Sequence, residues 1–89
     1  SYRIELLNED NYLPWKCRVL AILTDKELLG YVNGTKISEW EKNDGKAQSQ
    51  IILALGDSQM VHTAGAKTAA EMWSQITAVK ESSGTLGIM

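Results

Sequence analysis

The sequence has few of the residues from which catalytic and metal sites are built. It contains one cysteine and one histidine. Cys17 alone can neither form an intrachain disulfide nor complete a cysteine-based zinc site, and His62 lacks a supporting nucleophile motif. The glycines form no phosphate-binding pattern. We therefore expect no enzyme activity, cofactor or metal. Cys17 is predicted to be a small buried or half-buried hydrophobe, and His62 to be structural.

Clusters of positive charge and long apolar runs are also lacking. Nine Lys and Arg residues are scattered along a chain of net charge −2, which argues against nucleic-acid binding by this segment alone. No apolar run approaches the roughly 20 residues of a membrane span, and no signal peptide is visible. The single cysteine fits a reduced compartment. These features predict a cytoplasmic protein with no membrane partner and no small-molecule substrate.

Phenylalanine is absent, so three Trp and three Tyr supply the large aromatic packing of this 89-residue chain. The apolar pattern predicts one small all-α domain of about five helices, two of them short, over residues 1–81. Partial alternation over residues 2–7 is compatible with a short extended segment on the helices. Residues 82–89 are expected to be a tail or the beginning of a further helix.

The first helix is expected from about Leu13 to Lys26. Pro14 suits the first turn, and Trp15, Val19, Ile22 and Leu23 recur on one face. Cys17 and Leu20 widen that apolar side. A short helical turn over residues 27–32 should then lead to the Asn33–Gly34 turn.

Two sequences of the capping-box type mark later helices. The first, residues 38–41 (SEWE), opens a helix with Ala47, Ile51, Ala54 and Leu55 on one face. We expect this helix to pass through Gly45, although a restart capped by Asp44 is the alternative. The second, residues 68–71 (TAAE), opens a helix to about Lys80.

The last helix should bury a face made of Ala69, Met72, Trp73, Ile76 and Val79. Between the two capping boxes, Asp57 and Ser58 are expected to cap a short helix that ends at His62. Most carboxylates should lie on polar faces or at caps.

The tryptophans Trp15, Trp40 and Trp73 fall in three different predicted helices. Myb-type DNA-binding repeats also contain three tryptophans, but at closer spacing, and the acidic balance opposes that reading too. We therefore expect each Trp to anchor one helix in a shared core.

Taken in order, five segments resemble the Gag proteins of copia-type retrotransposons. The family patterns are L-N-x-x-N-Y-x-x-W, L-W/L-G-Y-V-x-G, D-x-K-A, I-x-x-x-L and K-T-A-x-E-M/I-W. The matching segments are residues 7–16 (LNEDNYLPWK), 28–34 (LLGYVNG), 44–47 (DGKA), 51–55 (IILAL) and 67–73 (KTAAEMW). The core positions implied by the resemblance are Leu7, Tyr12, Trp15, Val19, Ile22, Leu28, Val32, Trp40, Ile51, Leu55, Met72, Trp73 and Ile76.

The resemblance implies the N-terminal-like capsid domain of a Gag polyprotein, or a host protein derived from one. Such domains self-associate into a particle shell that encloses the element's RNA. RNA would be contacted only through regions outside this chain, since no cysteine–histidine zinc knuckle is present. The alternative is a domesticated adaptor that binds a peptide or another Gag protein, or that inhibits assembly.

Self-association should depend on apolar side chains left outside the core. We expect a homodimer or a higher oligomer. The candidate contact residues are Leu20, Leu29, Met60, Leu86, Ile88 and Met89.

Overall fold

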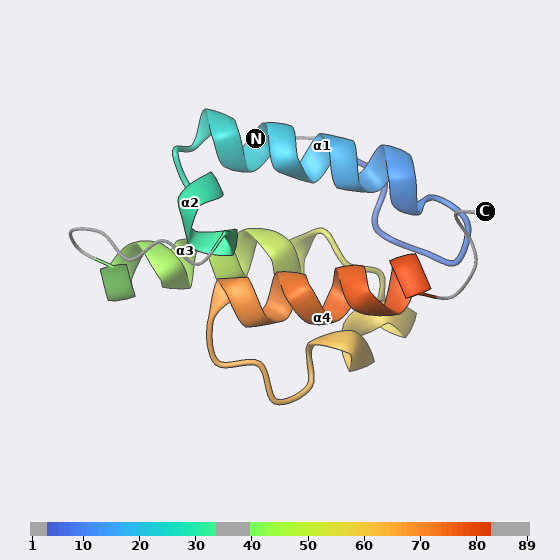
Figure 1. The fold of residues 1–89 in the computed structure, drawn as a ribbon. Coiled ribbons are helices and arrows are strands. Elements are labelled where there is room, and N and C mark those ends of the chain that lie inside the picture. Colours follow the sequence, from blue (N-terminus) through green and yellow to red (C-terminus); the bar gives the residue numbers. More distant parts are fainter. Residues whose placement is uncertain (1–3, 34–39, 83–89) are drawn as a thin grey trace.

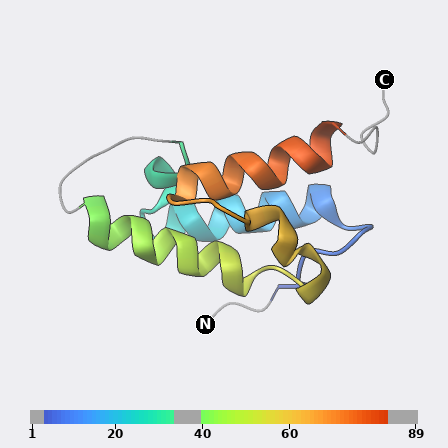
Figure 2. The same ribbon diagram turned by 90° about the horizontal axis from the view of Figure 1, so that it is seen from below.

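A computed structural model describes residues 4–33 and 40–82, and within these ranges the chain is helical apart from the N-terminal segment, residues 4–11, and short connections. Its elements are α1 (Tyr12–Asp25), α2 (Leu29–Val32), α3 (Trp40–Leu53), the 3-10 helix η1 (Asp57–Thr63) and α4 (Ala69–Ser82). The all-α prediction with two short helices is confirmed. Figure 1 shows α1 above α4, with the two helices running in opposite directions. Seen from below, α3 and α4 lie in front of α1 (Figure 2).

Helix α1 begins at Tyr12, one residue before the expected Leu13, and ends at Asp25, one residue before the expected Lys26. Pro14 lies in the first turn, where its missing N–H leaves no intrahelical bond unmade. The helix ends in a Schellman motif: the Leu28 N–H donates to the Leu23 carbonyl (2.7 Å) and the Glu27 N–H to the Thr24 carbonyl (3.0 Å). Glu27 has a φ of 61°, in the left-handed region. This motif turns the chain from α1 into α2.

Cys17 is exposed, so the prediction that it is buried or half-buried is wrong. The reason is helical geometry, because Cys17 follows the buried Trp15 by two residues and therefore points about 200° away from it. Leu20 is half-buried against the core, as the wider apolar side predicted.

Helix α3 passes through Gly45 without a break, as expected. The proposed cap at Ser38 lies outside the described residues, as do Gly34 of the predicted turn and residues 83–89. The N-terminal segment is held at the end of α3 by an isolated parallel bridge between Leu7 and Leu55. In this bridge the Leu7 N–H donates to the Ala54 carbonyl (2.9 Å) and the Gly56 N–H donates to the Leu7 carbonyl (3.1 Å).

The expected cap at Asp57 and Ser58 is wrong, because Gly56 precedes η1 and no side chain caps it. Before α4, the Thr68 hydroxyl accepts from the Glu71 N–H (3.1 Å), as a capping box requires. The Glu71 carboxylate, however, reaches the Lys67 N–H (2.8 Å) rather than that of Thr68.

On α4, Val79 is exposed and Lys80 is buried instead, so the prediction for Val79 is wrong. Val79 follows the buried Ile76 by three residues and Lys80 follows it by four. Either spacing returns to the same face of a helix, and the structure buries the residue at the spacing of four.

The core is shared by all the helices except η1. The indole rings of Trp15 and Trp73 are stacked, with centroids 5.5 Å apart. The Trp15 Nε1–H donates to the Ala54 carbonyl (2.8 Å), which ties α1 to the end of α3. Trp40 is only partly buried but packs against the same core. The three tryptophans thus belong to one core, from three helices.

Candidate interaction surfaces

The positions implied by the resemblance lie together in the core. All are buried except Trp40, which is half-buried. They come from the N-terminal segment and from α1, α2, α3 and α4, so they hold the helices together and leave the outer surfaces to other residues. His62 is half-buried on η1. No group of three or more metal-ligating side chains is present within residues 4–33 and 40–82.

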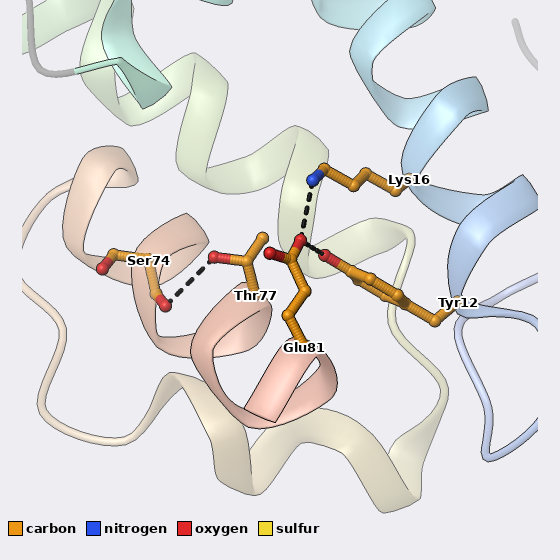
Figure 3. Close-up of polar contacts among 5 residues, drawn as sticks. All are labelled: Tyr12, Lys16, Ser74, Thr77 and Glu81. Carbon is orange, nitrogen blue, oxygen red and sulfur yellow. Dashed lines mark hydrogen bonds and ion pairs between the residues drawn. The ribbon is translucent and has the colours of Figure 1, made fainter. Parts of the chain in front are cut away.

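A polar cluster joins the beginning of α1 to the end of α4 (Figure 3). Lys16 Nζ lies 2.7 Å from Glu81 Oε2, and the Tyr12 hydroxyl donates to the same oxygen. Lys16 and then Tyr12, through these hydrogen bonds, lower the pKa of the Glu81 carboxyl below its ordinary value. The pKa of the Tyr12 hydroxyl is raised, chiefly by burial and then by its bond to Glu81, so it remains a donor. On the neighbouring turn of α4, the Thr77 hydroxyl donates to the Ser74 carbonyl (3.2 Å).

This cluster connects α1 to α4. Its ionised groups are already paired with each other, and Glu81 is partly exposed. Because these side chains bond to each other across the two helices, we assign the cluster a structural role.

A second polar contact connects α3 to α4 through Asp44, which is 3% exposed. Both carboxylate oxygens accept from the Ala69 N–H, at 3.1 and 3.3 Å. Gln48 Nε2 donates to Asp44 Oδ2 (2.7 Å). Asp44 was expected on a solvated face, as a cap, or as the start of its own helix. It is a cap, but of α4, whose N-terminal N–H groups favour a negative charge.

A third buried polar side chain, Gln59, connects η1 to the N-terminal loop. It is fully buried, and its Nε2 donates to Glu9 Oε2 (2.9 Å) and to Ser58 Oγ (3.1 Å). Its Oε1 is buried without a partner within the described residues. This contact fixes which face of η1 points inward.

An open groove of about 710 Å³ lies between the end of α1, α2 and α3. One wall is a stripe of α3 that includes Asn43, Lys46 and Leu53, and the other wall includes Lys26 and Tyr31. The Tyr31 hydroxyl accepts from Asn43 Nδ2 (3.1 Å), which connects the two walls. Leu53 is 73% exposed at this groove. We call this feature the α2–α3 groove.

Large apolar side chains are exposed on several elements. On η1, Val61 is 69% exposed and Met60 is 37% exposed. The others are Leu6, Leu13, Ile52, Leu53 and Val79. Of the candidate contact residues that the structure describes, only Met60 is exposed, whereas Leu20 and Leu29 are partly buried against the core. Leu86, Ile88 and Met89 lie outside the described residues.

The sequence reasoning missed Leu53 and Val61. Leu53 was overlooked because it adjoins the buried Ile51, Ala54 and Leu55 in an apolar run. On a helical wheel Leu53 lies about 200° from the buried Ile51, so its outward position could have been predicted from the sequence. The α2–α3 groove could not be found in this way, because its walls come from separate segments.

Comparison with known protein families agrees with the resemblance noted in the sequence. The model of one family, described as gag-polypeptide of LTR copia-type, matches residues 19–85. No curated protein and no solved structure matches the chain. Among the described residues, no helix is long and apolar enough to cross a membrane.

Proposed function

Because the chain belongs to the copia-type Gag polypeptide family, we propose that it is a self-association module whose copies build the particle shell around the element's RNA. Gag-family domains are structural rather than catalytic. The observation that supports self-association is the exposure of large apolar side chains on ordered helices, with Leu53 and Val61 foremost. Apolar groups exposed in this way favour association with another protein surface.

The proposed assembly uses a weak contact repeated many times. The core positions implied by the resemblance are buried in each copy, apart from the half-buried Trp40, so the domain can present its outer apolar side chains without unfolding. Burial of those side chains in a neighbouring copy then supplies the favourable free energy.

Light-scattering mass measured across a concentration series, at low and high salt, tests this proposal. We expect the mass to rise with concentration at both salt levels, because apolar contacts are not screened by ions. A monomer mass at every concentration would contradict self-association by this domain.

A second function, that of a peptide-binding adaptor or assembly inhibitor, is favoured by the α2–α3 groove. The groove has both apolar and polar lining residues, as peptide-binding grooves do. A pull-down that recovers a heterologous partner, from a domain that does not associate with itself, would support this alternative.

A further inference from the structure

We propose that copies of this domain associate head to tail, with η1 of one copy seated in the α2–α3 groove of the next. This inference rests on the proposed self-association and names the two surfaces that carry it. The occupant of the groove is therefore a second copy of this chain.

Because a 3-10 helix has three residues per turn, residues three apart in η1 share a face, and η1 has three faces. Gln59 and His62 are three residues apart and form its inward face, where Gln59 is fully buried. Two faces remain, one with Asp57 and Met60 and the other with Ser58 and Val61, and all four residues are exposed. The segment thus offers an apolar pair beside a carboxylate.

The α2–α3 groove has the complementary chemistry. It carries Lys26 and Lys46 against a single carboxylate, that of Glu27. Leu53 supplies an exposed apolar surface in the same groove. We infer that Val61 and Met60 contact Leu53 while Asp57 lies toward Lys46, which is exposed.

The α2 side of the groove lies away from η1 in the same molecule, whereas Leu53, at the end of α3, precedes η1 by four residues. In Figure 1, α2 is at the left and η1 is at the lower right, beneath the end of α4. Gln75 Nε2 holds the end of η1 to α4 by donating to the carbonyls of His62 (2.9 Å) and Ala64 (3.1 Å). These bonds hold η1 on its own copy, so its exposed side chains are available to a second copy. A contact between two different surfaces leaves one of each unused at the ends of the assembly, so further copies can add. The result is a ring or an open chain.

Single substitutions on each surface provide the first test. Leu53→Asp and Val61→Asp should each weaken self-association by on the order of tenfold to a hundredfold, the effect of losing one buried apolar side chain. Leu13→Asp is the matched control, since Leu13 is 58% exposed on α1 and lies on neither surface. It should associate like the unmodified chain. Light scattering gives the masses, and circular dichroism checks that each variant is folded.

Mixing the two variants provides the decisive test. The L53D chain retains an intact η1, and the V61D chain retains an intact groove. At concentrations where each variant alone is monomeric, an equimolar mixture should form a 1:1 dimer, because one functional contact remains between unlike chains. In an interface that pairs identical surfaces, the mixed dimer would contain both Leu53→Asp and Val61→Asp. Mixing would then restore no contact, and no such dimer would form.

Charge reversal tests the polar part of the contact. Lys46→Glu and Asp57→Lys should each weaken association by about two- to fivefold, as expected for an exposed ion pair. The chain with both changes should recover most of the loss at low salt.

The outcomes separate this inference from the proposed function. If the unmodified chain remains monomeric, self-association itself is wrong. If it associates but L53D and V61D behave like L13D, or if their mixture does not dimerise, the head-to-tail contact is wrong and another surface carries the assembly.

Discussion

At the scale of single residues, the most consequential polar group is Asp44. Its carboxylate is almost completely buried, yet both oxygens accept from the first N–H of α4. The unmatched N–H groups of a helix start carry partial positive charge, so a carboxylate placed there stabilises the helix. Asp44 therefore fixes the position of α4 on α3 as well as capping it.

Replacement of Asp44 by Ala should lower the free energy of unfolding by about 1–3 kcal/mol, because a buried N–H loses its acceptor. Urea denaturation of the two proteins gives this difference. Asp44→Asn keeps one acceptor oxygen and should recover part of the loss. The control, Asp57→Ala, removes an exposed carboxylate and should change the stability by less than about 0.5 kcal/mol. Equal losses for D44A and D57A would contradict the capping role.

Asp44 also shows where sequence reasoning stops at this scale. Its polarity predicted a cap or a solvated position, but the capped helix begins 25 residues later, and only the packing of α3 on α4 brings the two together. The prediction for Cys17 was wrong for a different reason. The apolar character of its side chain was given more weight than its angular position on the helix.

At the scale of elements, two glycines differ in what surrounds them. A Cβ added to Gly45, within α3, would meet nothing within 4 Å. A Cβ added to Gly56 would lie 2.7 Å from the Leu7 carbonyl oxygen, a backbone atom of the bridge to the N-terminal segment. The φ of Gly56 is −71°, so its backbone conformation itself suits alanine. The only obstacle at Gly56 is therefore steric.

These environments predict opposite effects of one substitution. Gly45→Ala should stabilise the protein by about 0.5–1 kcal/mol, the ordinary gain of Ala over Gly within a helix. Gly56→Ala should destabilise it by about 1–3 kcal/mol, as overpacking typically does, because the N-terminal segment must move away. Thermal unfolding of the two variants beside the unmodified protein measures both effects. A stabilising Gly56→Ala would show that the Leu7–Leu55 bridge is not essential to the fold.

The contact between α1 and α4 predicts a dependence on pH. Lys16 and Tyr12 lower the pKa of Glu81 below its ordinary value of 4.5. A lowered pKa in the folded state contributes stability that is present above pH 4.5 and is lost as the pH falls through the folded value. Because the side chain of Glu81 is 39% exposed, solvent screening limits this contribution to about 0.2–1 kcal/mol.

Glu81→Gln should therefore lower the free energy of unfolding at pH 7 by that amount and have little effect at pH 3. Urea denaturation at the two pH values tests this. The control is Lys16→Met with and without Glu81→Gln, a double-mutant cycle in which the pair should couple at pH 7 only. A difference that remains the same at pH 3 would assign the effect to packing.

The elements themselves were largely predictable, because their signals are local. Apolar periodicity identified α1, α3 and α4, and the Thr68 box marked the start of α4 to within a residue. The short 3-10 helix was expected near its true position, but its cap was not found. The α2–α3 groove depends on contacts between α1, α2 and α3, which no local pattern specifies.

At the scale of the whole molecule, Trp15 and Trp73 and the residues around them join α1, α2, α3 and α4 in one core. Such a domain is expected to unfold as a single cooperative unit. If assembly requires the folded surfaces on η1 and in the α2–α3 groove, association removes folded monomer from the equilibrium. The apparent stability then depends on protein concentration.

The melting temperature of the unmodified protein should accordingly rise with concentration. At concentrations of about 100 times the dissociation constant, linkage adds about 2.7 kcal/mol. For a chain of this size each kcal/mol raises the melting temperature by roughly 4–8 °C. V61D should behave as the unmodified protein does at a ten- to hundredfold lower concentration, so its melting temperature should rise less over the same range. Scanning calorimetry over a hundredfold concentration range measures both proteins. If V61D gained as many degrees as the unmodified chain, η1 would not be the surface through which folding and assembly are coupled.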